Sequence, residues 1–191
     1  NTMQQPDLPS AYRLVSLETV DSTNAEARRL ALLGEEETPD GTLVWAKEQT
    51  AGRGRRGRTW SSPPGNLYLS LVLRPEIAAE KAAEFGFIAA LAIFDTLGSV
   101  GEPGHNVHCK WPNDVLLNEK KVAGILLETE TGGSGIPDWV ILGVGLNVGI
   151  FPADTDFPAT SLRAESMAAS EVECLDSFCR HFLKWTNTWL E

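Results

Sequence analysis

The sequence predicts an α+β fold, with a mixed and mostly antiparallel sheet flanked by helices. Apolar residues alternate at every second position in several short stretches, which is typical of half-buried strands. Three longer stretches have helical periodicity instead, and the last four expected strands follow one another with no helix between them. A doubly wound parallel sheet needs a crossover helix between neighbouring strands, so this order of elements excludes it.

The first strand and the first helix open the expected fold. A strand is predicted over residues 12–20 and a helix over 21–34. Thr23 is the predicted N-cap, and Glu26, three residues later, would complete a capping box. Gly34 marks the end of this helix, since glycine is common just after a helix C-terminus.

The rest of the chain supplies the remaining strands and helices. In the stretch 66–74 the leucines occupy one face, and Tyr68, Ser70 and Val72 occupy the other. An alanine-rich helix is expected over 76–98, and the last helix carries a seam of large apolar residues that should face the core. The other strands are expected at 41–48, 107–111, 115–118, 121–130 and 139–148.

The composition indicates a folded chain of one domain. Of its 191 residues, 42% are hydrophobic and 22% are charged, as in globular domains. No uninterrupted apolar run reaches the roughly 18–20 residues of a membrane span, and no signal peptide is visible. The net charge of −10 argues against nucleic acid as the main partner. Cys109, Cys174 and Cys179 lack metal-ligand spacing, so we expect a reducing, cytoplasmic setting.

A basic, glycine-rich loop interrupts this acidic chain. Residues 52–58 read GRGRRGR and fit the spacing G-x-G-x-x-G of dinucleotide-binding loops. Such a loop must lead into a helix, but Pro63 and Pro64 follow instead, and the G-K-[ST] of a Walker loop is missing. The backbone N–H groups of its glycines and the guanidinium groups of its arginines are instead suited to bind phosphate or carboxylate. A solvated surface loop and a nucleic-acid patch are the alternatives.

Two further features favour a ligand cleft. Lys110 ends a predicted strand directly before a Pro-Asn-Asp turn, where its charge would be held in place, although many strand lysines are simply solvated. Gly124, Gly143 and Gly145 lie inside predicted strands, where glycine weakens packing unless a ligand or another backbone comes close. They would form a flat pocket floor, or else allow close packing of a helix. Asp114, in the turn, is at least as readily structural as functional.

Together these motifs resemble the biotin–protein ligase family. The matching stretches are DSTN from Asp21, GRGRRGRTW from Gly52, NLYLSL from Asn66, KWPNDV from Lys110, KVAGILLE from Lys121 and GVGLNV from Gly143. They follow the order of the family's motifs and span residues 21–148. The resemblance implies a catalytic core akin to class II aminoacyl-tRNA synthetases, with a mixed sheet and flanking helices.

The resemblance also implies a two-step reaction. Biotin carboxylate attacks the α-phosphate of ATP, which gives biotinyl-5′-AMP and pyrophosphate, and a lysine of a biotin carboxyl carrier protein then takes the biotinyl group. The loop arginines would neutralise the repulsion between the carboxylate and the triphosphate. Mg²⁺ is expected with ATP, which supplies most of its ligands, and no protein ligand is assigned to it.

The resemblance assigns site residues by their positions in these motifs. The residues expected to bind biotin are Ser22, Thr23, Asn24, Gln49, Gly52, Arg53, Gly54, Lys110, Gly124, Gly143 and Gly145. Those expected to bind ATP or the adenylate are Arg53, Arg55, Arg58, Trp60, Lys110 and Asn147. Lys110, which would stabilise charge that develops at the α-phosphate, and Arg55 are the expected catalytic residues.

Some expectations concern what surrounds this core. Certain family members carry an N-terminal DNA-binding domain, and many carry a C-terminal β-barrel. We expect residues 1–191 to form a single catalytic domain without the N-terminal module, with the β-barrel absent or cut away, and no binding to DNA. The resemblance also implies that homodimers can form through an exposed sheet edge, which can receive the carrier protein as well.

The alternative is a lipoate– or octanoate–protein ligase or transferase of the same superfamily. The transferases that work without ATP need a cysteine nucleophile. Cys109 should face away from Lys110, because side chains alternate along a strand. Although His105 and His108 are close in sequence, we expect Cys109 to act as a small core residue and not as a nucleophile.

Overall fold

A single mixed sheet forms the centre of the molecule. The computed structural model describes residues 5–110 and 113–191, and the following statements concern those residues. The strands are β1 (Arg13–Val20), β2 (Thr42–Gln49), β3 (Leu67–Leu73), β4 (Val107–Lys110), β5 (Asp114–Leu117), β6 (Lys120–Thr131) and β7 (Pro137–Leu146). Their order is β1-β2-β3-β7-β6-β5-β4. Only β1 and β2 run parallel, and all other neighbours are antiparallel, so the predicted mixed, mostly antiparallel sheet is confirmed.

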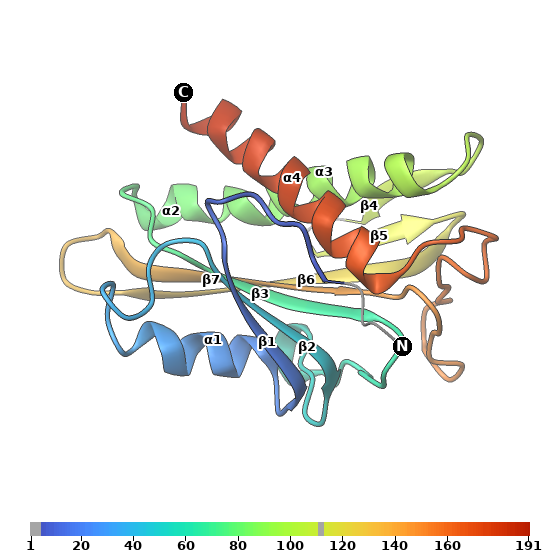
Figure 1. Cartoon of the computed structure of the whole chain (residues 1–191), viewed down its shortest axis with the longest axis horizontal. Helices are drawn as coiled ribbons and strands as arrows, with labels where there is room; N and C mark the ends of the chain where they lie inside the picture. Colours follow the sequence, from blue (N-terminus) through green and yellow to red (C-terminus); the bar gives the residue numbers. More distant parts are fainter. Residues whose placement is uncertain (1–4, 111–112) are drawn as a thin grey trace.

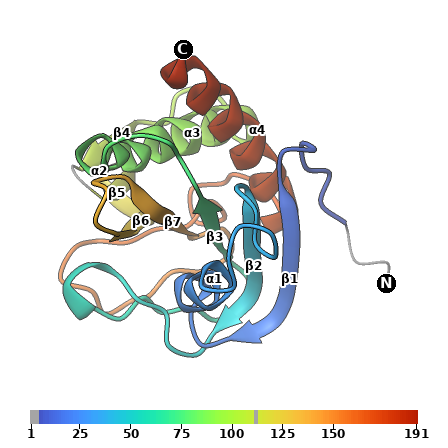
Figure 2. The same ribbon diagram turned by 90° about the vertical axis from the view of Figure 1, so that its left-hand side faces the viewer.

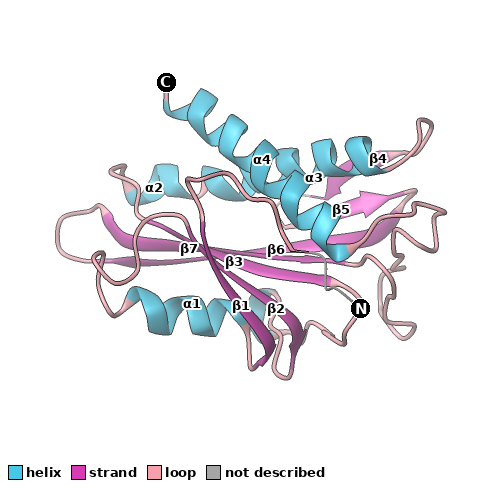
Figure 3. Ribbon diagram, viewed as in Figure 1, coloured by secondary structure: helices cyan, strands magenta, loops and turns pink. Residues whose placement is uncertain are grey.

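Helices cover both faces of this sheet. They are α1 (Thr23–Ala31), α2 (Ala79–Ala82), α3 (Glu84–Val100) and α4 (Glu171–Leu190). Figure 1 and Figure 3 show α1 alone on one face, with α3 and α4 packed together over the other. The predicted order of elements is confirmed, with one difference. The single helix predicted over 76–98 is divided at Ala83 into α2 and α3.

Each face of the sheet carries its own apolar core, and β3 contributes to both. Leu67, Leu69 and Leu71 belong to the larger core beneath α3 and α4. Val72 belongs to the smaller core beneath α1, together with Ala27. The two faces predicted for the stretch 66–74 are therefore confirmed.

The start of α1 differs from the prediction by one residue. The N-cap is Ser22, whose side-chain oxygen accepts a hydrogen bond from Ala25 N at 3.3 Å. Thr23 is already helical, and its hydroxyl contacts Gln49 instead. Because the cap lies one residue earlier, Glu26 is not at the third helical position, and the predicted capping box is wrong.

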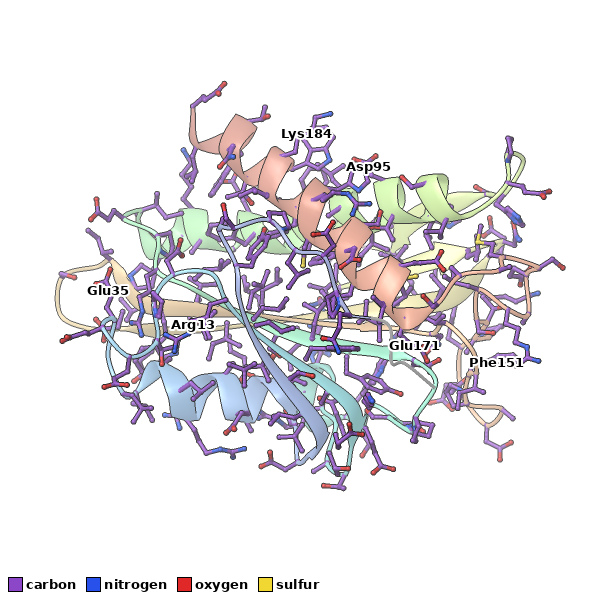
Figure 4. The ribbon with its side chains drawn as sticks, in the orientation of Figure 1. Arg13, Glu35, Asp95, Phe151, Glu171 and Lys184 are labelled. Carbon is purple, nitrogen blue, oxygen red and sulfur yellow. The ribbon has the colours of Figure 1, made fainter. Side chains whose placement is uncertain are left out.

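Aromatic contacts join α3 to α4. Phe85 of α3 meets Trp189 of α4 edge-on, with ring centroids 5.0 Å apart. Trp185 Nε1 donates to a carboxylate oxygen of Asp95 at 2.6 Å, where the two helices pass each other (Figure 4). The predicted apolar seam of the last helix thus lies on the core, with Phe178 and Phe182 buried.

One segment is long and apolar enough to cross a membrane by length and composition alone. Residues 79–100, which include α2 and α3, form this segment. Glu84 and Asp95 lie within it, so it is not an uninterrupted apolar run. The inner side of this segment forms part of the larger core, as Ile88, Ala89 and Ile93 show by their burial.

Candidate active site

A cavity of about 340 Å³ lies on the α1 face of the sheet. The loop between β2 and β3, which carries the arginines, lines this cavity. It lies on the same side of the sheet as α1 (Figure 2). The start of α1, the end of β2, the turn before β5, and the middle of β6 and β7 complete its walls. Segments far apart in sequence therefore meet around one space.

The α1 end of the cavity is polar and uncharged. It is lined by Ser22, Thr23, Asn24 and Gln49. Thr23 donates to Gln49 Oε1 from both its backbone N (2.8 Å) and its hydroxyl (3.1 Å). Gln49 Nε2 donates to Ser62 Oγ at 2.8 Å, so this amide is held at both ends.

The residue before Ser22 stabilises the start of α1. Asp21 accepts from Ser22 N at 2.8 Å and pairs with Arg29 at 2.8 Å. The hydrogen bonds from the Arg29 guanidinium lower the pKa of Asp21 to about 2, so that it stays ionised beside the positive end of the helix. Ser22 Oγ uses a lone pair to cap the helix, which leaves its O–H to donate into the cavity.

The strand glycines make room for side chains of the protein itself. A β-carbon on Gly124 would lie 2.8 Å from the Trp60 indole, and one on Gly145 would lie 2.6 Å from Trp60 Nε1. A β-carbon on Gly143 would collide with the Asn24 amide. All three line the cavity, but the predicted flat floor is covered in part by Trp60 and Asn24. Trp60 Nε1 is buried and has no hydrogen-bond partner among the described residues.

The arginine loop is a short hairpin with a tight tip. Gly54 N donates to Arg58 O at 2.7 Å, and Trp60 N donates to Gly52 O at 2.9 Å. The tip is a 3-10 turn over Arg55–Gly57, and the positive φ of 70° at Gly57 explains a glycine there. No helix N-terminus faces the cavity from this loop, which agrees with the exclusion of a dinucleotide fingerprint.

Six cationic side chains line the same cavity. They are Arg53, Arg55, Arg56, Arg58, Lys110 and Lys121. Lys110 Nζ lies 4.0 Å from the centroid of the Phe157 ring, and Lys121 Nζ lies 3.0 Å from Asp114 Oδ1. Such a concentration of positive charge, in a protein with a net charge of −10, indicates a site for a polyanion.

Comparison with known proteins identifies the family. A sequence model of the Biotin/lipoate A/B protein ligase family matches residues 16–147. The chain belongs to this family. It is 44% identical to a biotin–[acetyl-CoA-carboxylase] ligase of Paracoccus denitrificans over 88% of this chain and 71% of that one. It is 40% identical to the bifunctional ligase/repressor BirA of Bacillus subtilis, of whose length it spans about half (47%).

Solved structures of the family have the same fold. The biotin protein ligase of Leishmania major in complex with biotinyl-5-AMP superimposes with a TM-score of 0.73 at 30% identity, covering 92% of this chain and 75% of that one. The Aquifex aeolicus enzyme in complex with biotin and ATP gives a TM-score of 0.70 at 30% identity, covering 92% and 71%.

Two predicted site residues of this family member lie outside the cavity lining. Gly52 is buried, and a β-carbon there would collide with the carbonyl of Trp60 and the hydroxyl of Ser62. Asn147 is buried as well, and its Nδ2 donates to Thr160 O at 3.1 Å. Both positions have packing or hydrogen bonds that account for them.

Several cavity residues were not predicted. They are Arg56, Thr59, Asn113, Lys121, Ile125, Leu126 and Val144. Asp114, whose role the sequence left open, lines the cavity too. Arg56 and Lys121 belong to the motifs GRGRRGRTW and KVAGILLE, and their positive charge could have identified them as site residues. Glu128, the last residue of the motif KVAGILLE, contacts both Arg53 (3.2 Å) and Asn24 (2.8 Å), and it was not predicted as a site residue. Trp111 and Pro112 of the motif KWPNDV lie outside the described residues.

Cys109 takes the place expected for a small core residue. It is partly buried against the larger core, and burial raises the pKa of its thiol. His108 Nε2 lies 3.6 Å from Glu119, and His105 Nδ1 lies 3.2 Å from the Asn118 amide. These partners direct both imidazoles to the hairpin turn between β5 and β6, and a thiol with a raised pKa is a poor nucleophile.

Proposed function

We propose that this chain is the catalytic region of an ATP-dependent biotin–protein ligase. The observation that carries the proposal is one cavity with an uncharged polar end and six cationic side chains. Biotin combines a neutral ureido ring with a carboxylate, and its activation brings that carboxylate against a triphosphate. The relatives' names and the ligands in the solved structures support the same choice.

The uncharged end suits the ureido ring of biotin. Ser22 retains a donor for the ureido oxygen, and Thr23 and Asn24 flank it on the first turn of α1. These three side chains are buried and already hydrogen-bonded to other parts of the protein, so their positions are fixed before a ligand arrives. We assign the biotin ring to this end.

The cationic end suits the carboxylate and the triphosphate. A biotin carboxylate oxygen attacks the α-phosphorus, the bond to the bridging oxygen breaks, and pyrophosphate leaves. Charge builds on the α-phosphate in this step, and Lys110 and Arg55 would stabilise it from the cavity wall. Lys110 is exposed and lies over the Phe157 ring, and a phosphate would offer it a stronger partner than this ring does.

The second step consumes the adenylate. The neutral ε-amine of a carrier lysine attacks the acyl carbon of biotinyl-5′-AMP, AMP leaves, and the amine loses a proton. Because the mixed anhydride is hydrolysed readily, the arginine loop that lines the cavity would close over it and exclude water until the carrier arrives.

Mg²⁺ would accompany ATP and neutralise charge on its phosphates. The described residues contain no group of three or more His, Cys, Asp or Glu side chains that could hold a metal. Asp114 is the carboxylate in the cavity lining, and Asn113 Oδ1 beside it is buried without a partner among the described residues. This donor set fits an ion that takes most of its ligands from ATP and water.

Further parts of the proposal concern partners and setting. We propose that the carrier is a biotin carboxyl carrier protein, that the enzyme works in the cytoplasm without binding DNA or a membrane, and that homodimers can form at a sheet edge. The net charge of −10 supports the absence of DNA binding. We also propose that residues 1–191 form one catalytic domain.

ATP–pyrophosphate exchange tests the proposal. We expect exchange that requires biotin and is lost in Lys110→Ala, while Lys184→Ala on the opposite face (Figure 4) keeps it. Exchange with lipoate or octanoate in place of biotin would move the chain to the sister enzymes of its family. Absence of exchange with all three acids would contradict the proposed activity of this chain.

A further inference from the structure

Glu128 joins the arginine loop to the uncharged end of the cavity. Its Oε1 accepts a hydrogen bond from Arg53 Nη2 at 3.2 Å and another from Asn24 Nδ2 at 2.8 Å. Arg53 begins the loop, Asn24 lies in the first turn of α1, and Glu128 lies on β6. One carboxylate oxygen therefore connects three separate parts of the chain.

The hydrogen bonds continue from Asn24 to the other end of the loop. The Asn24 amide oxygen contacts Ser70 Oγ, which lies 2.7 Å from Thr23 Oγ1. From there the bonds run through Gln49 to Ser62, whose hydroxyl donates to the carbonyl oxygen of Trp60 at 2.7 Å. Both ends of the loop are thus fastened to one set of mostly buried side chains.

We propose that Glu128 is a positioning residue that holds the arginine loop over the cavity and couples its closure to ligand binding at the uncharged end. The identity of that ligand, biotin, rests on the proposed function. A ligand that bonds to Thr23 or Asn24 contacts the same side chains that fix Arg53 and Trp60. The binding free energy that stabilises this arrangement of side chains therefore also stabilises the closed loop.

Limited digestion with trypsin tests this proposal, because the loop itself carries the cleavage sites. Glu128→Gln removes the charge that holds Arg53 and keeps an oxygen that can accept from Asn24. Without ligand, we expect cleavage after Arg55, Arg56 and Arg58 to be about threefold faster than in the wild type, since an exposed ion pair is lost. Biotin should also protect the loop less than it does in the wild type.

The matched control is Glu130→Gln, which neutralises an exposed carboxylate two residues along the same strand and should leave the cleavage rate unchanged. Loop cleavage is scored relative to cleavage after Arg180 in the middle of α4, which rises only with general unfolding. Arg53→Gln should give the same loop-cleavage rate as Glu128→Gln, and so should the double variant. The two changes break the same contact, so their effects should not add.

Wild-type cleavage rates in Glu128→Gln, or additive effects in the double variant, would overturn the proposal. The effect of Glu128→Gln is measured without ligand, so it does not depend on which acid the enzyme uses. If biotin failed to protect the wild-type loop while lipoate or octanoate succeeded, the proposed substrate would be wrong, and the role of Glu128 would stand.

Discussion

The Trp60 indole lies over Gly145, with Nε1 2.6 Å from the position that a β-carbon of this glycine would take. The same ring lies over Gly124, which pairs directly with Gly145 across β6 and β7. Two glycines on adjacent strands therefore admit one tryptophan at the base of the cavity. Glycine is required at these positions by a side chain of the protein, whatever ligand binds above it.

Gly145→Ala is expected to move the indole or the strand beneath it. Overpacking of this kind costs about 1–3 kcal/mol of unfolding free energy. It should also raise the KM for ATP, because Trp60 lines the proposed nucleotide site. Urea unfolding and exchange assays measure the two effects. Gly133→Ala, where a β-carbon would meet no atom within 4 Å, is the control. Equal stability and KM in both variants would contradict this account.

The two cysteines of α4 should be nearly unreactive in the folded protein. Burial raises the pKa of Cys174 and of Cys179 to about 12. At pH 8 the thiolate fraction is then on the order of 10³-fold lower than for an ordinary thiol, and it increases as the pH rises towards 12. Mass spectrometry after iodoacetamide treatment, with and without urea, measures this. Native Cys174 that is alkylated as fast as in urea would refute the prediction.

Trp185→Phe should weaken the contact between α3 and α4. It removes the indole N–H that donates a hydrogen bond to Asp95 at 2.6 Å and keeps an aromatic ring in place. Asp95 is partly exposed, so water can replace the indole, and we expect a loss of about 1 kcal/mol. The urea midpoint measures it, with exposed Asn187→Ala on the same helix as the control. An unchanged midpoint in Trp185→Phe would show that the bond contributes nothing.

Much of the fold could be predicted because its signals are local. The alternating leucines in the stretch 66–74 fix both faces of β3 from period alone, and the spacing in the last helix places Phe178 and Phe182 on the core. The break between α2 and α3 at Ala83 has no such signal, since alanine favours a continuous helix. The N-cap was misplaced because Thr23 and Glu26 have the spacing of a capping box, although serine is the better cap of the two.

The candidate site could be predicted only where motifs name its residues. Lys110 and the three predicted loop arginines, Arg53, Arg55 and Arg58, line the cavity as expected. The pair Arg53–Glu128 joins residues 75 positions apart, so it depends on how β6 lies against the loop. Asn147 follows a glycine-rich strand like a site residue, yet its amide is used inside the fold, which only tertiary contacts reveal.

Glu165→Gln should lower the free energy of unfolding near neutral pH, and should lower it by less in acid. The Glu165 carboxylate accepts from Thr160 (2.7 Å), Asn118 (3.0 Å) and Lys120 (3.1 Å). Mainly through Thr160, these bonds lower the pKa of Glu165. Since the folded pKa is the lower one, the stabilisation is complete above the ordinary pKa, about 4.5, and is lost as the pH falls through the folded value.

We expect Glu165→Gln to cost about 1 kcal/mol of unfolding free energy at pH 7, because charge-assisted bonds are replaced by neutral ones. The difference from the wild type should shrink steadily below pH 4. Urea titrations at pH 7, 5, 4 and 3 measure it, with exposed Glu36→Gln as the control. A difference that stays constant down to pH 3 would mean that the ionised carboxylate does not hold the turn between β5 and β6. The stabilisation would then come from the shape of the side chain.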